Sequence, residues 1–229
     1  RAFVTGKLAN LRVTLLRAAR NTEGLQVESS VDAIRRAEHR AEQAESLAEL
    51  RGHEGNGSAA YFGVFNQLIK AEGISFPKRV RRPPTDPVNA LLSFGYALLA
   101  NDIHAAVQVL GFDPYCGYLH ADRYGRPSLA LDLMEEFRPI VVDTVVLACF
   151  NKRILQPTDF EVSLGDVHRL KPDARKKFLV QYEERKQTEI QHPVFAYRAT
   201  YQRCFELQAR ILAKHIQGEI ERYESFVVR

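Results

Sequence analysis

Apolar residues recur at steps of three and four along most of this chain, which is the period of an α-helix with one buried face. The clearest stripes lie in three N-terminal segments, with charged residues between their members. Their apolar positions are Leu8, Leu11, Leu15 and Leu16; then Val31, Ile34, Ala37, Ala41, Ala44 and Leu47; then Ala60, Phe62, Phe65, Leu68 and Ile69. The pattern predicts amphipathic helices, the last resuming after an interruption by Gly52, Gly55 and Gly57.

The middle of the chain alternates loops with apolar helices. Residues 73–87 contain four prolines and a basic cluster, so we expect a loop there. Asp86 followed by Pro87 is typical of a helix start, with an N-cap and a proline at the first helical position. This helix should run to about Leu99, and a second should begin at Asn101 or Asp102 and end at Gly111.

The C-terminal half is also mostly helical in pattern. After a loop through Pro127, Ser128 should begin a helix that Pro139 kinks or splits before the apolar run of residues 140–150. Residues 160–170 favour a hairpin that turns at Gly165 and Asp166. Two more helices are expected at about 173–189 and 194–223. The predicted fold class is all-α: one multi-helix domain over residues 1–229, with a single small β-hairpin near 160–170.

Composition places the chain among globular proteins, since 229 residues with 45% hydrophobic content can bury a full core. No apolar run reaches the roughly 18 residues of a membrane span, and no signal peptide opens the chain, so we expect a soluble, cytoplasmic protein. The spacing and odd number of Cys116, Cys149 and Cys204 favour reduced thiols. Because Met134 is the only methionine, we expect Arg1 not to be the natural start.

Charge is distributed unevenly along the chain. The formal net charge is +4, but residues 101–150 hold three Arg and Lys against seven Asp and Glu, which leaves the remaining residues at +8. A basic protein with an acidic centre is typical of nucleic-acid enzymes, in which positive surface neutralises phosphates and a local anionic pocket holds a divalent cation.

Three separated segments carry side chains that suit a hard metal ion. Glu54 stands between glycines that let a ligand approach closely, His120 ends a loop, and Asp132 precedes Glu135 and Glu136 by three and four residues. At that helical spacing the three carboxylates can share one face. Carboxylates favour Mg²⁺ or Mn²⁺, and an imidazole among them favours Mn²⁺. The residues therefore indicate a metal-dependent nuclease.

Each of these features also has an ordinary structural explanation. Acidic residues early in a helix often only complement its dipole, and Arg138 can pair with Glu135 or Asp132 within the helix. The basic cluster at 78–82 can be a solvated loop or a set of phosphate contacts; its members are Lys78, Arg79, Arg81 and Arg82.

Two rival functions stay open on this reasoning. A helical module that only binds nucleic acid would use the basic loop without a metal. A di-iron carboxylate bundle would need paired Glu-x-x-His motifs, and this chain has one, from Glu189 to His192.

Several strings taken together resemble one family in order along the chain. They are KLANLR at residues 7–12, GHEGN at 52–56 with YF at 61–62, DPVNALLSFGY at 86–96, GFDPY at 111–115 with GYLH at 117–120, and RPSLALDLMEEFRP at 126–139. This pattern resembles the catalytic domain of the CRISPR spacer-acquisition integrase, the CRISPR-associated endonuclease "Cas one". The resemblance runs from about Lys7 to the C-terminus.

The resemblance implies a helical catalytic domain that binds Mg²⁺ or Mn²⁺ through Glu54, His120 and Asp132, with an accessory acidic position at Glu135. Family members form homodimers and assemble with a small dimeric partner, "Cas two", to insert DNA into the CRISPR array. Their N-terminal β-rich dimerisation domain is expected to be absent here.

The implied reaction is metal-assisted phosphoryl transfer. The 3′-hydroxyl of an incoming DNA end attacks a backbone phosphate at the repeat boundary and releases a new 3′-hydroxyl. Water in place of that hydroxyl would give hydrolysis, so nuclease activity should accompany integration.

Overall fold

A computed structural model describes residues 1–120 and 124–228. Its α-helices are α1 (Ala2–Arg20), α2 (Glu28–Gln43), α3 (Leu47–Val64), α4 (Pro87–Val109), α5 (Ser128–Met134), α6 (Thr144–Asn151), α7 (Pro172–Lys186) and α8 (Tyr201–Ile216). Short 3₁₀ turns are η1 (Phe65–Leu68) and η3 (Pro157–Asp159), and η2 (Arg138–Asp143) is a wider π-helical turn. The strands are β1 (Phe160–Ser163), β2 (Val167–Leu170), β3 (Glu189–Gln191) and β4 (Arg198–Thr200).

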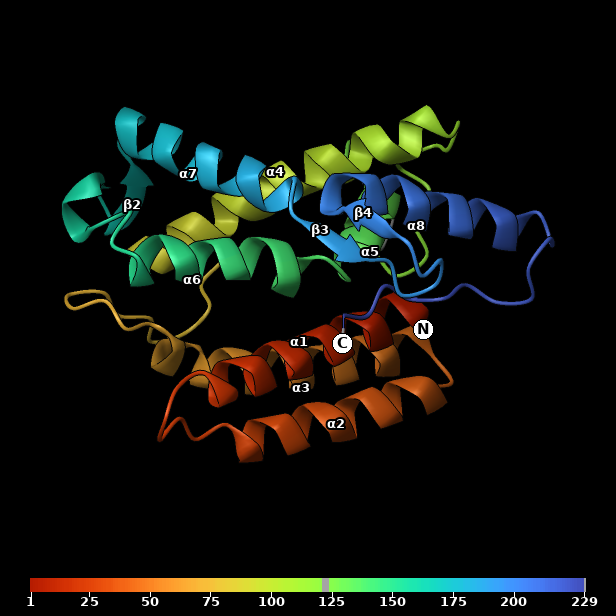
Figure 1. Cartoon of the computed structure of the whole chain (residues 1–229), viewed down its shortest axis with the longest axis horizontal. Coiled ribbons are helices and arrows are strands. Elements are labelled where there is room, and N and C mark those ends of the chain that lie inside the picture. The colour runs from red at the N-terminus through yellow and green to blue at the C-terminus, as the bar shows by residue number, and fades with distance from the viewer. Residues whose placement is uncertain (121–123, 229) are drawn as a thin grey trace.

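The helices form two layers (Figure 1). We call α1, α2 and α3, which pack side by side, the lower layer, and the elements from α4 to α8 the upper layer. Helix α4 runs through the upper layer and contacts α5, α6, α8 and η2. The layers meet where α1 packs against η2, and this boundary holds the candidate site.

The amphipathic stripes predicted for the lower layer are confirmed, except at the C-terminal end of the second stripe. Val31, Ile34, Ala37 and Ala41 are buried along α2, as their spacing predicts. Leu47 does not continue that stripe, because it opens α3 and is 50% exposed.

The expected interruption at the glycines is wrong, since α3 runs unbroken through Gly52, Gly55 and Gly57. Helix packing explains why one of them is there. A Cβ atom on Gly57 would overlap Cδ2 of the buried Leu8 on α1, whereas one on Gly55 would meet nothing within 4 Å. Close contact between α1 and α3 therefore outweighs the poor helix propensity of glycine.

Helix α4 is continuous, so the predicted break near Asn101 is also wrong. Its start is as expected: the side chain of Asp86 accepts a hydrogen bond from the backbone N–H of Asn89 at 2.7 Å. By length and composition α4 could cross a membrane, but it packs against upper-layer helices on several sides, as the core helix of a globular protein does.

The C-terminal half follows the prediction with one addition. Pro139 does separate α5 from α6, through η2, and β1 pairs with β2 around a turn at Gly165 and Asp166, both with positive φ. A second hairpin, β3 with β4, was not expected; it replaces the end of the first predicted helix and the start of the second, and α8 also ends earlier than predicted, at Ile216. The fold is thus helical with two small antiparallel sheets.

Glu136 does not share a face with Asp132 and Glu135, because α5 ends at Met134 and the chain turns. Its buried Oε2 instead accepts hydrogen bonds from Phe226 N–H at 2.9 Å, Gln208 Nε2 at 3.0 Å and the Tyr223 hydroxyl at 3.1 Å. Burial raises the pKa of Glu136 to about 8, although these donors oppose the rise. Glu136 therefore fastens the C-terminal segment to the core and is not a metal ligand.

Gly57→Ala should lower the free energy of unfolding by about 1–3 kcal/mol, because the new Cβ overpacks the contact with Leu8. Gly55→Ala is the matched control on the same helix and should raise it by about 0.5–1 kcal/mol, since alanine favours the helix and its Cβ meets open space. Urea unfolding followed by circular dichroism measures both. Equal changes at the two positions would contradict the packing explanation.

The raised pKa of Glu136 predicts a pH dependence of stability. Between pH 4.5 and about 8 the folded state keeps a proton that the unfolded state releases, so the free energy of unfolding should fall as pH rises through this window. Each pKa unit corresponds to about 1.4 kcal/mol. In Glu136→Gln this contribution should vanish, and urea midpoints from pH 5 to 9 would show it. Parallel pH profiles for the two proteins would refute the assignment.

Candidate active site

The carboxylate of Asp132 is fully buried and organises the loop that carries His120. Its Oδ2 accepts the backbone N–H groups of Tyr118 at 2.6 Å and Leu119 at 2.8 Å. Its Oδ1 accepts the backbone N–H of His120 at 2.9 Å and lies 2.6 Å from Nδ1 of the same residue. Both oxygens of Asp132 are therefore occupied by the loop.

Two further contacts hold this loop against the helices around it. At Gly117 a Cβ atom would come within 2.9 Å of the backbone carbonyl carbon of Ser128, so only glycine lets the loop approach the start of α5. From α3, Arg51 Nε donates to the carbonyl oxygen of Leu119 at 2.9 Å. The loop that bears His120 is thus held by both layers.

The imidazole of His120 has a fixed orientation. Because the Asp132 carboxylate can only accept, Nδ1 of His120 carries a proton, and Nε2 is the ring nitrogen that remains open to another partner. Nε2 faces Glu135 Oε1 at 3.8 Å. A carboxylate that orients the far nitrogen of a histidine is the usual arrangement behind a metal-binding imidazole.

Two further carboxylates meet at the ammonium group of Lys7. Lys7 Nζ from α1 forms ion pairs with Glu54 Oε1 from α3 and, at 2.7 Å, with Glu135 Oε2 from the upper layer. Glu54 also accepts from the Ser58 hydroxyl at 2.9 Å. Burial by itself raises the pKa of Glu135, but Arg138, Lys7 and His120 together lower it to about 2. Glu135 is therefore ionised at any physiological pH.

A pocket of about 260 Å³ opens over these groups. Its lining includes Glu54, Glu135 and His120 together with four arginines: Arg51, Arg81, Arg126 and Arg138, the last paired with Glu135 at 3.0 Å. The same pocket therefore contains carboxylates that suit a cation and guanidinium groups that suit phosphate oxygens.

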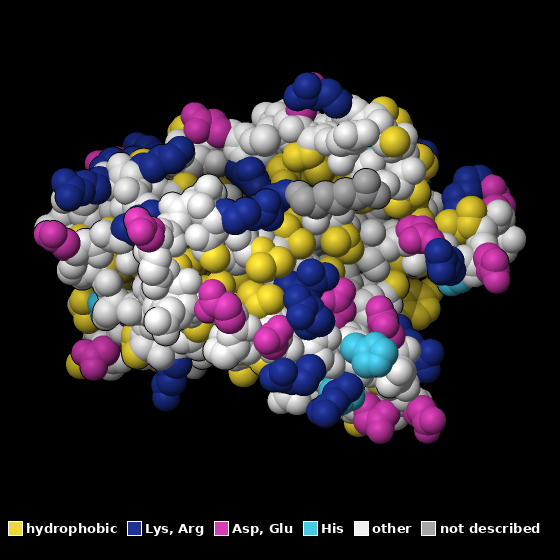
Figure 2. Space-filling view, turned by 60° about the horizontal axis from the view of Figure 1, so that its bottom comes forward, with side chains coloured by type: hydrophobic (Ala, Val, Ile, Leu, Met, Phe, Trp, Pro, Cys, Tyr) yellow, Lys and Arg dark blue, Asp and Glu magenta, His cyan; other side chains and the backbone are white. Residues whose placement is uncertain are grey.

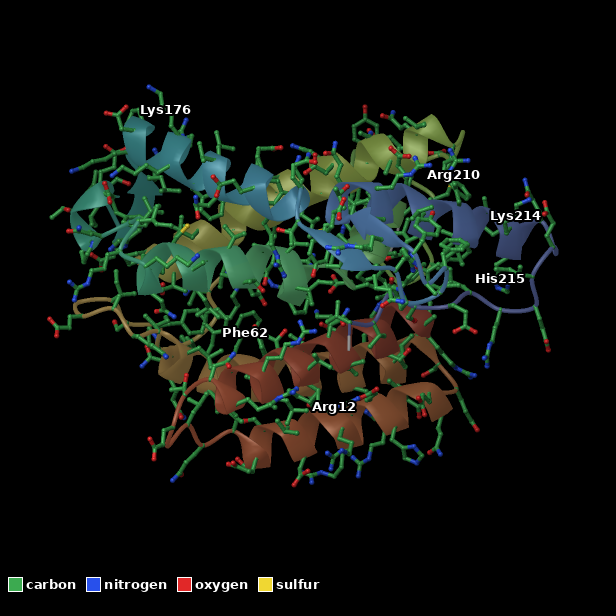
Figure 3. The ribbon with its side chains drawn as sticks, viewed as in Figure 1. Arg12, Phe62, Lys176, Arg210, Lys214 and His215 are labelled. Carbon is green, nitrogen blue, oxygen red and sulfur yellow. The ribbon has the colours of Figure 1, made fainter. Side chains whose placement is uncertain are left out.

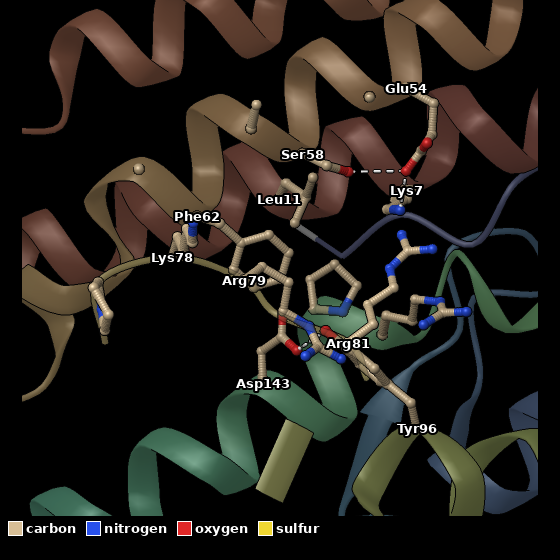
Figure 4. Close-up of a pocket in the computed structure, with 16 residues that line it drawn as sticks. Lys7, Leu11, Glu54, Ser58, Phe62, Lys78, Arg79, Arg81, Tyr96 and Asp143 are labelled. Atoms are coloured by element: carbon tan, nitrogen blue, oxygen red, sulfur yellow. Dashed lines mark hydrogen bonds and ion pairs between the residues drawn. The ribbon is translucent and has the colours of Figure 1, made fainter. Parts of the chain in front are cut away.

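A groove of about 430 Å³ shares Glu54, Arg81 and Arg138 with this pocket (Figure 4). It lies along the boundary of the layers, where Phe62 projects from α3 towards the upper layer (Figure 3). Tyr96 donates a hydrogen bond at 2.6 Å to Asp143, which also lines the groove. Burial raises the pKa of Asp143 to about 6.

The predicted basic loop divides into three kinds of residue. Lys78 and Arg81 are exposed and line the groove, whereas Arg82 is exposed but lines neither space. Arg79 lines the groove but is held in place: it donates to Asn89 Oδ1 at 2.7 Å, and its guanidinium lies 5.5 Å from the ring centroid of Tyr96. Of the four predicted phosphate contacts, Lys78 and Arg81 have the best placement.

The predicted site residues lie close together but do not have the arrangement of metal ligands. The contacts run from Glu54 through Lys7 to Glu135, then to His120 and Asp132. Among residues 1–120 and 124–228, no three His, Cys, Asp or Glu side chains form a group that could hold a metal ion. A site built from Glu54, His120 and Asp132 stays a prediction.

Sequence reasoning missed Lys7, although one signal was present. Lys7 stands directly before Leu8 in the first apolar stripe and is 7% exposed, and a buried lysine requires an anionic partner. The rival di-iron motif, in contrast, has no suitable geometry. Glu189 lies on β3 in an ion pair with Arg198 at 3.2 Å, and His192 is fully buried with Nδ1 near backbone N–H groups.

Comparison with known proteins identifies the family. Residues 1–184 match the family described as "CRISPR associated protein Cas1". CRISPR-associated endonuclease Cas1 3 of Thermus thermophilus is 46% identical over 227 residues, which cover 99% of this chain and 65% of that protein. CRISPR-associated endonuclease Cas1 1 of Chlorobaculum tepidum is 41% identical over 235 residues, covering 100% of this chain and 68% of that protein. The chain therefore spans about two thirds of these two relatives.

Solved structures share the fold. A CAS1 protein from Thermotoga maritima has a TM-score of 0.79 at 26% identity, covering 96% of this chain and 68% of that chain. A casposase bound to integration product has a TM-score of 0.87 at 23% identity, covering 97% and 61% respectively, and this likeness shows the fold alone. With a family match over residues 1–184 and relatives above 40% identity along its whole length, this chain belongs to the Cas1 family of CRISPR-associated proteins.

Proposed function

We propose that this protein is a metal-dependent DNA integrase and endonuclease of CRISPR adaptation. The observation that carries the proposal is the pocket that Glu54, His120 and Glu135 line together with four arginines. Acidic and basic groups in one small pocket suit a phosphate together with a divalent cation. The endonuclease names of the relatives support the same class of reaction.

The donor set fits Mg²⁺ or Mn²⁺, because two carboxylates and one imidazole line the same pocket, and both carboxylates already pair with a cation, the ammonium of Lys7. The geometry favours Glu54, His120 Nε2 and Glu135 as ligands. Asp132, which the sequence placed among the ligands, has both oxygens occupied by the loop and would instead orient His120. The metal would polarise the scissile phosphate and stabilise the oxygens that attack and leave.

The chain's own residues bind and position the DNA. Arg81 and Arg138 line both the pocket and the groove, so they can bind non-bridging oxygens of the attacked phosphate and of its neighbour. The 3′-hydroxyl of the incoming DNA attacks the phosphorus of the target strand. One phosphodiester bond forms, another breaks, and the target strand leaves with a new 3′-hydroxyl. Attack by water gives strand cleavage instead.

The DNA path follows the groove and not a broad basic surface. Figure 2 shows Lys and Arg side chains interspersed with Asp and Glu on one face, so positive charge is not continuous there. Lys176 projects from the outer side of α7, away from the layer boundary (Figure 3). Lys78 and Arg81 extend the positive groups of the site along the groove.

The proposal also includes partners, which we infer from a solved structure with the same fold. One solved neighbour is a Cas6-RT-Cas1–Cas2 complex, with a TM-score of 0.85 at 27% identity over 98% of this chain and 24% of that chain. We infer that the protein assembles with a "Cas two" partner and DNA, as a homodimer, in the cytoplasm of a prokaryotic cell. Residues 1–229 would form its helical catalytic unit, and dimerisation through a β-rich domain would lie outside them.

Glu135→Gln should abolish Mn²⁺ binding and strand transfer, because it removes a carboxylate that faces His120 and Glu54. Asp132→Asn should retain Mn²⁺ binding and lose roughly 10- to 100-fold in strand transfer, the usual cost of disturbing a residue that orients a ligand. Isothermal titration with Mn²⁺ and a strand-transfer assay separate the two effects. Loss of Mn²⁺ binding in Asp132→Asn alone would restore Asp132 as the ligand. Unchanged strand transfer in both variants would exclude catalysis here and favour a module that only binds nucleic acid.

Replacing both Lys78 and Arg81 with alanine should flatten the log–log salt dependence of DNA affinity by up to about 1.8 units, since each lost phosphate contact contributes about 0.9. Arg82→Ala is the control, because Arg82 is exposed on the same loop but lines neither the groove nor the pocket. Fluorescence anisotropy of branched DNA at several salt concentrations measures the slopes. An equal effect of Arg82→Ala would show that the groove is not the DNA path.

A further inference from the structure

Lys7 is a buried cation placed between two carboxylates that come from different layers. Its side chain is 9% exposed, and Nζ contacts Glu54 Oε1 and, at 2.7 Å, Glu135 Oε2. A buried ammonium is stable only with such partners, and the two carboxylates equally need a positive charge between them. Lys7 therefore neutralises the acidic side of the pocket.

The position of this ammonium conflicts with a metal bound by the same carboxylates. A divalent ion would bind these oxygens at about 2.0–2.2 Å, and the ammonium donates its hydrogen bonds to them from 2.7 Å or less. Both cations would then lie within a few ångströms of each other and would compete for the same lone pairs. The carboxylate pair can therefore hold either the ammonium or the metal.

The ammonium of Lys7 can also occupy a second position, in the groove. Lys7 lines the groove together with Arg81 and Arg138, and its unbranched stem lets the ammonium move without displacing α1. Arg138 cannot exchange in the same way, because its guanidinium lies 4.6 Å from the ring centroid of Tyr96 and is paired with Glu135 at 3.0 Å. An ammonium released from the carboxylates would meet a DNA phosphate in the groove.

We propose that Lys7 is an exchangeable cation that couples metal binding to DNA binding. Without metal its ammonium occupies the site between Glu54 and Glu135; metal binding expels it, and it then binds a phosphate of the DNA substrate. The inference rests on the proposed metal and DNA site. Linkage makes the effect reciprocal: DNA draws Lys7 away from the carboxylates and strengthens metal binding, and metal strengthens DNA binding.

The test measures the Mn²⁺ dissociation constant of wild-type protein and Lys7→Met, each with and without branched DNA that lacks a 3′-hydroxyl. Methionine keeps the length of the stem and removes the charge. Lys7→Met should bind Mn²⁺ more tightly than wild type without DNA, by about 5- to 150-fold, the usual range for coupled sites. Added DNA should tighten Mn²⁺ binding in wild type and much less in Lys7→Met.

Two control variants separate this proposal from the proposed function. Lys78→Met removes another groove ammonium that touches neither carboxylate, so it should weaken DNA binding and leave the Mn²⁺ affinity unchanged. Glu135→Gln should bind no Mn²⁺. If wild type itself binds no Mn²⁺, the metal site fails and the exchange fails with it. If wild type binds Mn²⁺ and Lys7→Met binds it equally or more weakly, the exchange is wrong while the metal site stands.

A wild-type measurement covers the case in which Lys7→Met does not fold. Reductive methylation followed by peptide mass spectrometry reports how accessible each lysine is. Lys7 should be methylated slowly without metal and several-fold faster with Mg²⁺, whereas the exposed Lys78 should be methylated at the same rate in both conditions. A Lys7 rate that Mg²⁺ does not change would overturn the proposal.

Discussion

The site depends on the buried carboxylate of Asp132. It accepts three backbone N–H groups from residues 118–120 and the imidazole of His120, so one side chain fixes both the path of a loop and the orientation of a ring. An unpaired carboxylate at this depth would be costly, and each N–H group would lose its partner with it. The loop, the imidazole and the start of α5 therefore keep their arrangement only together.

The second constraint is that the site joins two layers. Glu54 and Lys7 come from the lower layer, and Glu135 and His120 come from the upper layer. The ion pair between Lys7 and Glu135 crosses the boundary at 2.7 Å, between side chains that are 9% and 5% exposed. Correct docking of the layers is thus a condition for the chemistry, and any motion at their boundary would alter the distance between Glu54 and His120.

Charged groups of both signs line the pocket, with more guanidinium groups than carboxylates. The ionised Glu135 pairs with Arg138 and with Lys7. Such a pocket can accept a cation and a phosphate together, because each neutralises groups that the other does not reach. The face shown in Figure 2, in contrast, carries Lys and Arg side chains interspersed with Asp and Glu.

Apolar stripes that repeat over several turns were enough to predict most of the helices, whereas the site predicted from Glu54, His120 and Asp132 stays a prediction. Only the tertiary structure decided that α3 passes through its glycines, because the reason lies in the contact of Gly57 with Leu8 on another helix. It likewise gave Asp132 and Glu135 different contacts, with backbone N–H groups of the loop on Asp132 and the Lys7 ammonium on Glu135, since helical spacing says which residues are near but not which groups they contact. Sequence reasoning missed Lys7 for the same reason, because its partners Glu54 and Glu135 lie in distant segments. A lysine cannot be assigned to a cluster of carboxylates until its position in the fold is known.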